Sequence, residues 1–206
     1  MDILLTDPVS GQRTGLERTV IRTLSALSGS GVRYSVIGAV ALAVRGFPRM
    51  TRDFDVVLRA ADAEHTVSAL HDAGLQQETP SGPKDAPEPM IVFSDPSRTV
   101  EVRLHLAAGD PEDTVIDQAR RARVLGMEAP VALLEHLLLL YLYSNQPKHL
   151  GDFATIIRSG QAELGKVERT LAEIHPEMLP EWGRRVLSAQ SPPPAPARPA
   201  PRKRRR

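Results

Sequence analysis

Residues 34–58, YSVIGAVALAVRGFPRMTRDFDVVL, decide the fold of this chain. They open with an apolar run that predicts a strand, turn at Gly38 into a short helix rich in alanine and valine, and break at Gly46. A second strand then begins with Asp53 and Asp55, one residue apart. Because side chains alternate across a strand, these two carboxylates point the same way, about 6–7 Å apart. Such a pair indicates either a cation site or a charged strand end.

The context of this pair is more informative than its spacing. The chain has three acid-x-acid pairs, no more than chance gives for 25 acids in 206 positions. The pairs at residues 62/64 and 110/112 lie at predicted helix starts, where the helix dipole explains them. The pair at 53/55 instead opens an apolar strand after a glycine turn. A helix start after such a turn binds phosphate, and carboxylates on the next strand would hold Mg²⁺ against that phosphate.

Glu101 is the candidate for a third carboxylate. In residues 99–106, one face of the predicted strand is apolar, and the other carries Glu101, Arg103 and His105. If this strand lies beside the strand of Asp53 and Asp55, Glu101 completes a cluster of three carboxylates. The alternative is that Glu101 and Arg103 form an exposed ion pair on a solvated face.

Composition sets the broad class. The chain is 41% hydrophobic and 25% charged, as in a globular protein of one domain or one and a half. The absence of cysteine excludes disulfides, thiolate metal sites and a cysteine nucleophile. No secretion signal is recognised, and the longest apolar stretch, residues 131–143, is too short to span a bilayer. We therefore expect a cytoplasmic protein with no membrane partner.

The formal net charge of +1 conceals a difference between body and tail. Six of the 26 basic residues lie in the tail, which has no acid: Arg198, Arg202, Lys203, Arg204, Arg205 and Arg206. The body therefore has 20 basic against 25 acidic residues. The proline-rich segment 191–206 is predicted to be disordered. Its charge predicts either an RNA-binding tail or a solubilising one.

The order of elements predicts an α/β (α+β) fold, in which a small mixed sheet with flanking helices precedes a C-terminal helical bundle. Strands are predicted at 33–38, 53–58, 89–93, 99–106 and 123–125, and residues 76–89 as a loop. Helices are predicted at 16–28, 39–45, 61–73, 110–123, 131–144, 147–159, 162–175 and 177–189. We expect an α/β domain over residues 1–129, a helical domain over 130–189 and a disordered tail over 190–206.

These residues resemble a known family. Gly38-Ala39-x-Ala41, followed by Arg45-Gly46-x-x-Arg49-x-Thr51-x-Asp53-x-Asp55, is similar to the opening of the polymerase-β-like nucleotidyltransferases, in particular their AbiE-type toxin branch. The later order also resembles the family. It comprises a V-E-V strand at 100–102, a G-x-x-x-P-V segment at 126–131, and a helical pair with E-x-L and P-K-x-L-x-D patterns over 135–152. The resemblance covers residues 34–157.

The resemblance implies a metal-dependent transfer of a nucleoside monophosphate from an NTP to a hydroxyl acceptor. It assigns Asp53, Asp55 and Glu101 as catalytic ligands of Mg²⁺ or Mn²⁺, with Glu101 also helping to deprotonate the acceptor. The nucleotide-binding residues that it implies are Gly38, Ala39, Arg49, Thr51, Lys148 and Asp152. It implies RNA or tRNA as acceptor and an antitoxin protein as partner, within a toxin–antitoxin pair.

The chain departs from the family pattern at four positions. Ala39 replaces a second glycine, Glu101 replaces an aspartate, Tyr141 stands where a lysine is common, and His149 stands where an aspartate often follows Lys148. A tyrosine cannot neutralise phosphate charge, and phosphoryl transfer depends on such neutralisation. The alternative prediction is therefore a catalytically degenerate relative that binds nucleotide or a partner protein without turnover.

Overall fold

The computed structural model describes residues 14–78, 90–107 and 109–191 and confirms a mixed α/β fold. Its strands are β1 (Tyr34–Val36), β2 (Asp53–Arg59), β3 (Gln76–Gln77), β4 (Met90–Ser94), β5 (Glu101–Ala107), β6 (Arg120–Val124) and β7 (Met127–Val131). Its helices are α1 (Gly15–Ser30), α2 (Gly38–Val44), α3 (Ala63–Asp72), α4 (Glu112–Asp117), α5 (Leu134–Leu142), α6 (Pro147–Ser159), α7 (Leu164–Ile174) and α8 (Leu179–Gln190), with short 3-10 turns η1 (Ala60–Asp62) and η2 (Pro176–Met178).

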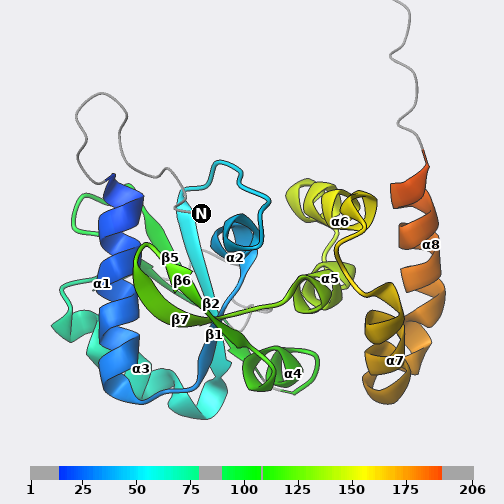
Figure 1. The fold of residues 1–206 in the computed structure, drawn as a ribbon. Helices are drawn as coiled ribbons and strands as arrows, with labels where there is room; N and C mark the ends of the chain where they lie inside the picture. The colour runs from blue at the N-terminus through cyan, green and yellow to red at the C-terminus, as the bar shows by residue number, and fades with distance from the viewer. Residues whose placement is uncertain (1–13, 79–89, 108, 192–206) are drawn as a thin grey trace, which may run out of the picture.

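Within the described residues, seven strands form one sheet in the order β3-β4-β5-β2-β1-β7-β6 (Figure 1). The β2–β5 and β1–β7 pairs are parallel, and the other pairs are antiparallel. The β2–β5 register sets Asp53 opposite Glu101 and Asp55 opposite Arg103. The strand that carries the acid pair therefore lies inside the sheet, beside the strand of the third candidate acid, which is the condition that the sequence left open.

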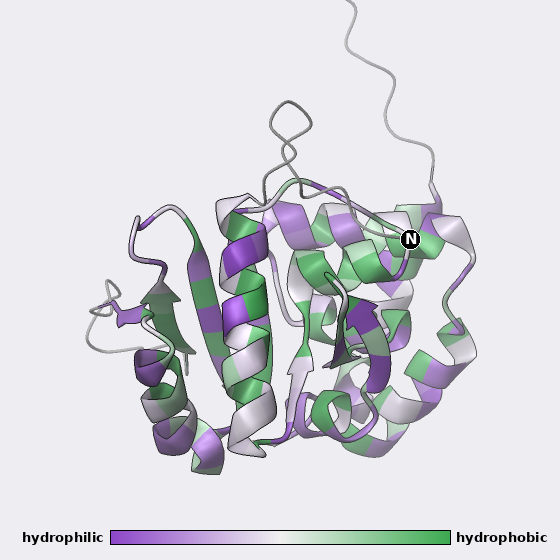
Figure 2. Ribbon diagram, turned by 60° about the vertical axis from the view of Figure 1, so that its left-hand side comes forward, coloured by the Kyte–Doolittle hydropathy of each residue, from purple (hydrophilic) through white to green (hydrophobic). Residues whose placement is uncertain are grey.

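Helices cover the sheet on both sides (Figure 1). Helix α1 packs with α3 on one side, while α5 to α8 gather on the other. Helix α1 is amphipathic, and its apolar stripe of Leu16, Val20, Leu24 and Leu27 is buried where the helix packs on the sheet. Figure 2 colours the ribbon by hydropathy and shows hydrophobic and hydrophilic residues interspersed along the helices. The core is largely aliphatic, and Phe54 and Phe93 are its largest fully buried side chains.

The predicted helix over residues 110–123 is wrong in its second half. Helix α4 ends at Asp117, and Arg120–Val124 instead forms strand β6 in a hairpin with β7. The hairpin turns at Leu125 and Gly126, whose φ angles of 53° and 85° are those of a type I′ turn. The short strand predicted at 123–125 was the end of this longer one.

The predicted start of the helical half is also corrected. Strand β7 runs to Val131, which pairs with Val36 of β1, and helix α5 begins only at Leu134. The expected boundary at residue 129 thus falls within a strand of the sheet, and the division into domains stays a prediction.

Two further expectations concern segments that are partly described. Gln76 and Gln77, predicted as loop, form the edge strand β3 against Phe93 and Ser94. Helix α8 includes Gln190, the first residue of the predicted tail. Residues 79–89 of the predicted loop and the Pro/Arg-rich tail from residue 192 lie outside the described residues. No helix in the described part of the chain combines the length and the apolar composition that a bilayer span needs.

Candidate active site

Strand β2 presents the two aspartates on one face. Phe54 and Val56 between and beyond them are fully buried on the opposite face, which fixes the strand's orientation. The Asp53 and Asp55 side chains keep 15% and 12% of their surface exposed. The hydroxyl of Thr51 donates a hydrogen bond to Asp53 Oδ1. Thr51, predicted to bind nucleotide, thus contacts the carboxylate that is predicted to bind metal.

Gly38 leaves room for the Asp55 carboxylate. Its φ angle is 63°, in the left-handed region, and a Cβ there would overlap Asp55 Oδ2 and lie 3.0 Å from Asp55 Cγ. A backbone hydrogen bond keeps the two segments together: the amide of Ile37, the residue between β1 and α2, donates to the Asp55 carbonyl at 3.0 Å. Ala39, by contrast, points its methyl group into the protein and is 2% exposed.

Two cations converge on Asp53. Arg103 Nη1 lies 2.6 Å from Asp53 Oδ2, and Lys148 Nζ lies 3.5 Å from the same oxygen. Burial by itself would raise the pKa of Asp53, but the Thr51 hydroxyl, Arg103 and Lys148 outweigh it and hold the pKa below its usual value. Asp53 is therefore ionised at neutral pH.

Glu101 is level with Asp53 but is occupied by Arg103. Arg103 Nη2 and Nε lie 2.6 and 3.0 Å from Glu101 Oε2, and the Glu101 side chain is 50% exposed. The adjacent-strand position and the ion pair, set out as alternatives from the sequence, therefore both occur. Among residues 14–78, 90–107 and 109–191, no group of three His, Asp or Glu side chains has the geometry to hold a metal ion.

The Asp53–Asp55 pair has the oxygen ligands that Mg²⁺ prefers. Mg²⁺ is commonly held by one or two carboxylates and takes its other ligands from water and substrate phosphates. Asp53 and Asp55, both on one face and with no side chain at residue 38 to crowd them, match that donor set. The role of Glu101 as a third metal ligand stays a prediction, and its partner in this structure is Arg103.

Arg49 and Asp152 bind each other. Arg49 Nε lies 3.0 and 3.1 Å from the two Asp152 oxygens, and Arg49 Nη2 lies 3.0 Å from Oδ2. This fork joins the loop before β2 to helix α6. The two residues, both predicted to bind nucleotide, thus link the sheet to the helical half, and their role toward nucleotide stays a prediction.

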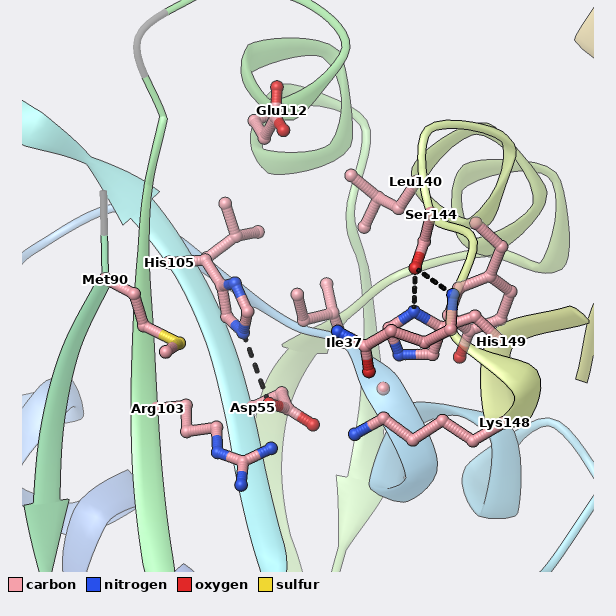
Figure 3. A pocket seen from close by; sticks show the side chains of 14 residues that line it. Ile37, Asp55, Met90, Arg103, His105, Glu112, Leu140, Ser144, Lys148 and His149 are labelled. Carbon is pink, nitrogen blue, oxygen red and sulfur yellow. Dashed lines mark hydrogen bonds and ion pairs between the residues drawn. The ribbon is translucent and has the colours of Figure 1, made fainter. Parts of the chain in front are cut away.

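A cavity of about 240 Å³ lies between the sheet and helices α4, α5 and α6. In Figure 3, Arg103 and Lys148 approach Asp55 from opposite sides, and Glu112 lies at the far end. His105 Nε2, 3.2 Å from Asp55 Oδ1, also lines the cavity. The sequence had put both residues on the polar face of their strand, where it gave Arg103 only the alternative of an ion pair with Glu101 and gave His105 no role.

Tyr141 and His149 form an aromatic wall of the cavity. Their rings stack at 4.9 Å with an interplanar angle of 22°, and His149 Nδ1 lies 2.7 Å from Ser144 Oγ. Tyr141 is 4% exposed, and its hydroxyl has no hydrogen-bond partner among the described residues. Burial, then the carboxylate of Asp152, raises the pKa of Tyr141, so the phenol keeps its proton and remains a donor.

Solved structures share this arrangement of elements. No family model and no curated relative matches the sequence. The nucleotidyltransferase ANT(2'')-Ia, in complex with adenylyl-2''-tobramycin, aligns over 80% of this chain and 99% of its own with a TM-score of 0.56 and 14% identity. The chain has the nucleotidyltransferase fold. The similarity confirms the α/β fold that the sequence predicted, whereas membership of the polymerase-β-like superfamily and of its AbiE branch stays a prediction.

Two further comparisons accompany this one. A solution structure of ANT(2'')-Ia, described as an antibiotic-resistance factor, aligns over 76% of this chain and 90% of its own with a TM-score of 0.54 and 14% identity. The lincomycin-bound lincosamide adenylyltransferase LnuA covers 68% of this chain and 95% of its own at 15% identity, with a TM-score of only 0.47. At these identities the similarity establishes the nucleotidyltransferase fold and leaves activity to be argued from the site.

Proposed function

We propose that this protein is a metal-dependent nucleotidyltransferase that moves a nucleoside monophosphate from an NTP to a hydroxyl group. One observation carries the proposal: Asp53 and Asp55 lie on one face of β2 in a nucleotidyltransferase fold, where Asp55 lines a cavity together with Lys148 and Lys148 Nζ lies 3.5 Å from Asp53 Oδ2. The ionised state of Asp53 supports it, because a metal ligand must be deprotonated.

The residues of this chain would act mainly by positioning. Asp53 and Asp55 would hold Mg²⁺ or Mn²⁺, and such an ion supplies charge neutralisation and alignment for an in-line displacement at the α-phosphate. Thr51 orients the Asp53 carboxylate, and Gly38 leaves the space that the Asp55 carboxylate occupies. Lys148, whose side chain is 39% exposed and whose Nζ lies 3.5 Å from Asp53 Oδ2, would add its positive charge beside a bound triphosphate. The acceptor oxygen would form a bond to the α-phosphorus while the bond from that phosphorus to the pyrophosphate oxygen breaks, and the hydroxyl proton would pass to Glu101, the carboxylate that the family resemblance assigns as base.

The test is transfer of label from each of the four α-³²P-labelled NTPs to total tRNA. Wild-type protein with Mg²⁺ is expected to label the acceptor, and Asp53→Asn to lose at least about 100-fold of the rate, because a metal contributes several kcal/mol and each 1.36 kcal/mol is tenfold. Asp72→Asn is the matched control, since Asp72 is exposed on α3. Labelling that survives Asp53→Asn contradicts the proposal.

The acceptor has two candidates. The family resemblance favours an RNA or tRNA 3′ end, with the protein acting as a toxin opposite an antitoxin partner. The size of the cavity, about 240 Å³, favours a small hydroxylated molecule, and the ANT(2'')-Ia structure holds such a molecule as its adenylyl-2''-tobramycin adduct. The same assay with an aminoglycoside panel in place of tRNA separates them, because only one class would acquire label.

A second candidate function is nucleotide binding without turnover. The observation that favours it is Tyr141, an uncharged side chain where the family commonly has a lysine. Calorimetry with ATP and CTP in the presence of Mg²⁺ tests it together with a pyrophosphate-release assay. Binding with no pyrophosphate supports this candidate, and sustained pyrophosphate release contradicts it.

A further inference from the structure

Arg103 occupies the place that joins two of the three candidate carboxylates. Its guanidinium contacts Asp53 Oδ2 through Nη1 at 2.6 Å and Glu101 Oε2 through Nη2 at 2.6 Å and Nε at 3.0 Å. Strand register dictates this position, since Arg103 lies opposite Asp55 and two residues beyond Glu101 on the same face. The side chain is 27% exposed and also lines the cavity.

The contacts leave enough carboxylate oxygen for one ion. Each carboxylate oxygen accepts about two contacts, and those of Asp53 Oδ2 are taken by Arg103 and Lys148. Asp53 Oδ1 keeps one position beside the Thr51 hydroxyl, and Asp55 Oδ1 keeps one beside His105. The other Asp55 oxygen, Oδ2, is turned into the space beside Gly38. A second ion in a paired site, about 3.5–4 Å from the first, needs further shared oxygens. Glu101 Oε2 is bound twice by Arg103.

We propose that this site takes a single divalent ion, held by Asp53 and Asp55, and that the guanidinium of Arg103 is the resident second cation. The inference rests on the proposed function and deepens it. Arginine suits this role because it is always charged and its planar fork binds two carboxylates at once. Its face toward the cavity places a fixed positive charge beside any phosphate that the ion brings in.

The experiment counts ions by Mn²⁺ electron paramagnetic resonance on the full chain. Protein is mixed with an equimolar α,β-methylene NTP, each of the four in turn, and titrated with Mn²⁺. One magnetically isolated Mn²⁺ per protein is the expected result. A spin-coupled pair of Mn²⁺ ions would overturn the inference and leave the metal-dependent function standing. No bound Mn²⁺ with any analogue would overturn the metal-dependent function together with the inference.

Removing the resident cation provides the second arm. Arg103→Met is expected to admit a second Mn²⁺ and produce the spin-coupled signal, because Glu101 and Asp53 Oδ2 are released together. Arg59→Met is the matched control. Arg59 also binds two carboxylates, those of Asp113 and Asp117, but it lies at the opposite end of β2 from Asp53. The Arg59→Met protein should therefore still bind one isolated Mn²⁺ ion. A folded Arg103→Met protein that still binds one isolated ion would overturn the inference.

Discussion

At residue 38, the lack of a side chain decides where a carboxylate lies. Asp55 Oδ2 fills the volume that a Cβ at this position would take, and Gly38 has a left-handed φ of 63°. We expect Gly38→Ala to push Asp55 out of place and to weaken Mn²⁺ binding at least about tenfold, because displaced ligands cost metal affinity. Strain at a positive φ should also lower the free energy of unfolding by about 1–2 kcal/mol.

Gly31→Ala separates these two effects. Gly31 has a φ of 73°, yet a Cβ there would meet nothing within 4 Å. The Gly31→Ala variant should lose about as much stability as Gly38→Ala and keep full Mn²⁺ affinity. Calorimetric Mn²⁺ titration and urea unfolding measure both quantities. Equal Mn²⁺ affinities in the two variants would mean that the Asp55 position does not depend on the space at residue 38.

Single residues also show which features of the site could be predicted from the sequence and which could not. The common orientation of Asp53 and Asp55 could be predicted, because side-chain alternation in a strand and a glycine turn depend only on residues close in the sequence. The pairing of Arg103 with Asp53 was not, since it depends on which strand lies beside β2 and in what register. Likewise, Tyr141 stood out as a departure, but its stacking on His149 brings together residues of two helices. Local chemistry is readable from sequence, whereas partners set by packing are not.

At the scale of elements, helix α5 carries a buried histidine at its start. His136 is 2% exposed, its Nδ1 accepts from the Leu133 amide at 3.3 Å, and its Nε2 has no partner among the described residues. Burial, then the charge of Lys166, lowers the pKa of His136 to about 4. The folded protein thus holds this ring neutral, while the unfolded chain protonates it at about pH 6.5.

The pH dependence follows from this difference. Below about pH 6.5 the unfolded state binds the extra proton, so His136 makes stability fall as the pH drops toward about 4. From pH 7 to 4.5, wild type should lose about 2 kcal/mol more than His136→Gln. Urea unfolding of both proteins at pH 7 and at pH 4.5 measures this difference in the free energy of unfolding.

His175 provides a control of opposite sign. Hydrogen bonding to the Asp110 carbonyl, then to Glu177, raises the pKa of His175. Its contribution is present at low pH and is lost as the pH rises through the folded-state pKa, so His175→Gln should remove stability chiefly at acidic pH. Parallel pH profiles for wild type and His136→Gln would contradict the assignment of the buried histidine.

Elements with local signals were predicted best. Helix α6 has the predicted bounds, with Pro147 in its first turn and Gly160 after its end. Strand β7 was missed because its sequence contains Pro130 and a weak apolar pattern. Its strand character comes from pairing with β1, almost a hundred residues earlier in the chain, and with β6. Non-local pairing of this kind overrides local propensity.

At the scale of the whole molecule, the cavity lies between the sheet and the helical half, so its shape depends on how the two are joined. The Arg49–Asp152 fork is one such join, and only 10% of the Asp152 side chain is exposed. A carboxylate this buried is costly when its partner is removed. Arg49→Ala should therefore lower the free energy of unfolding by about 2 kcal/mol, discounted from a fully buried pair because Arg49 is 30% exposed.

A double-mutant cycle isolates this pair. Arg49→Ala, Asp152→Ala and the double variant are unfolded in urea, and a coupling energy of about 1–2 kcal/mol is expected because the contact is bidentate and shielded. The Arg123–Glu128 pair, whose side chains are 81% and 54% exposed, is the matched control and should couple by less than about 0.5 kcal/mol. Equal coupling in both pairs would mean that the Arg49–Asp152 fork does not hold the helical half on the sheet. The cavity would then owe its shape to other contacts between the two parts, among them that of Lys148 on α6 with Asp53 on β2.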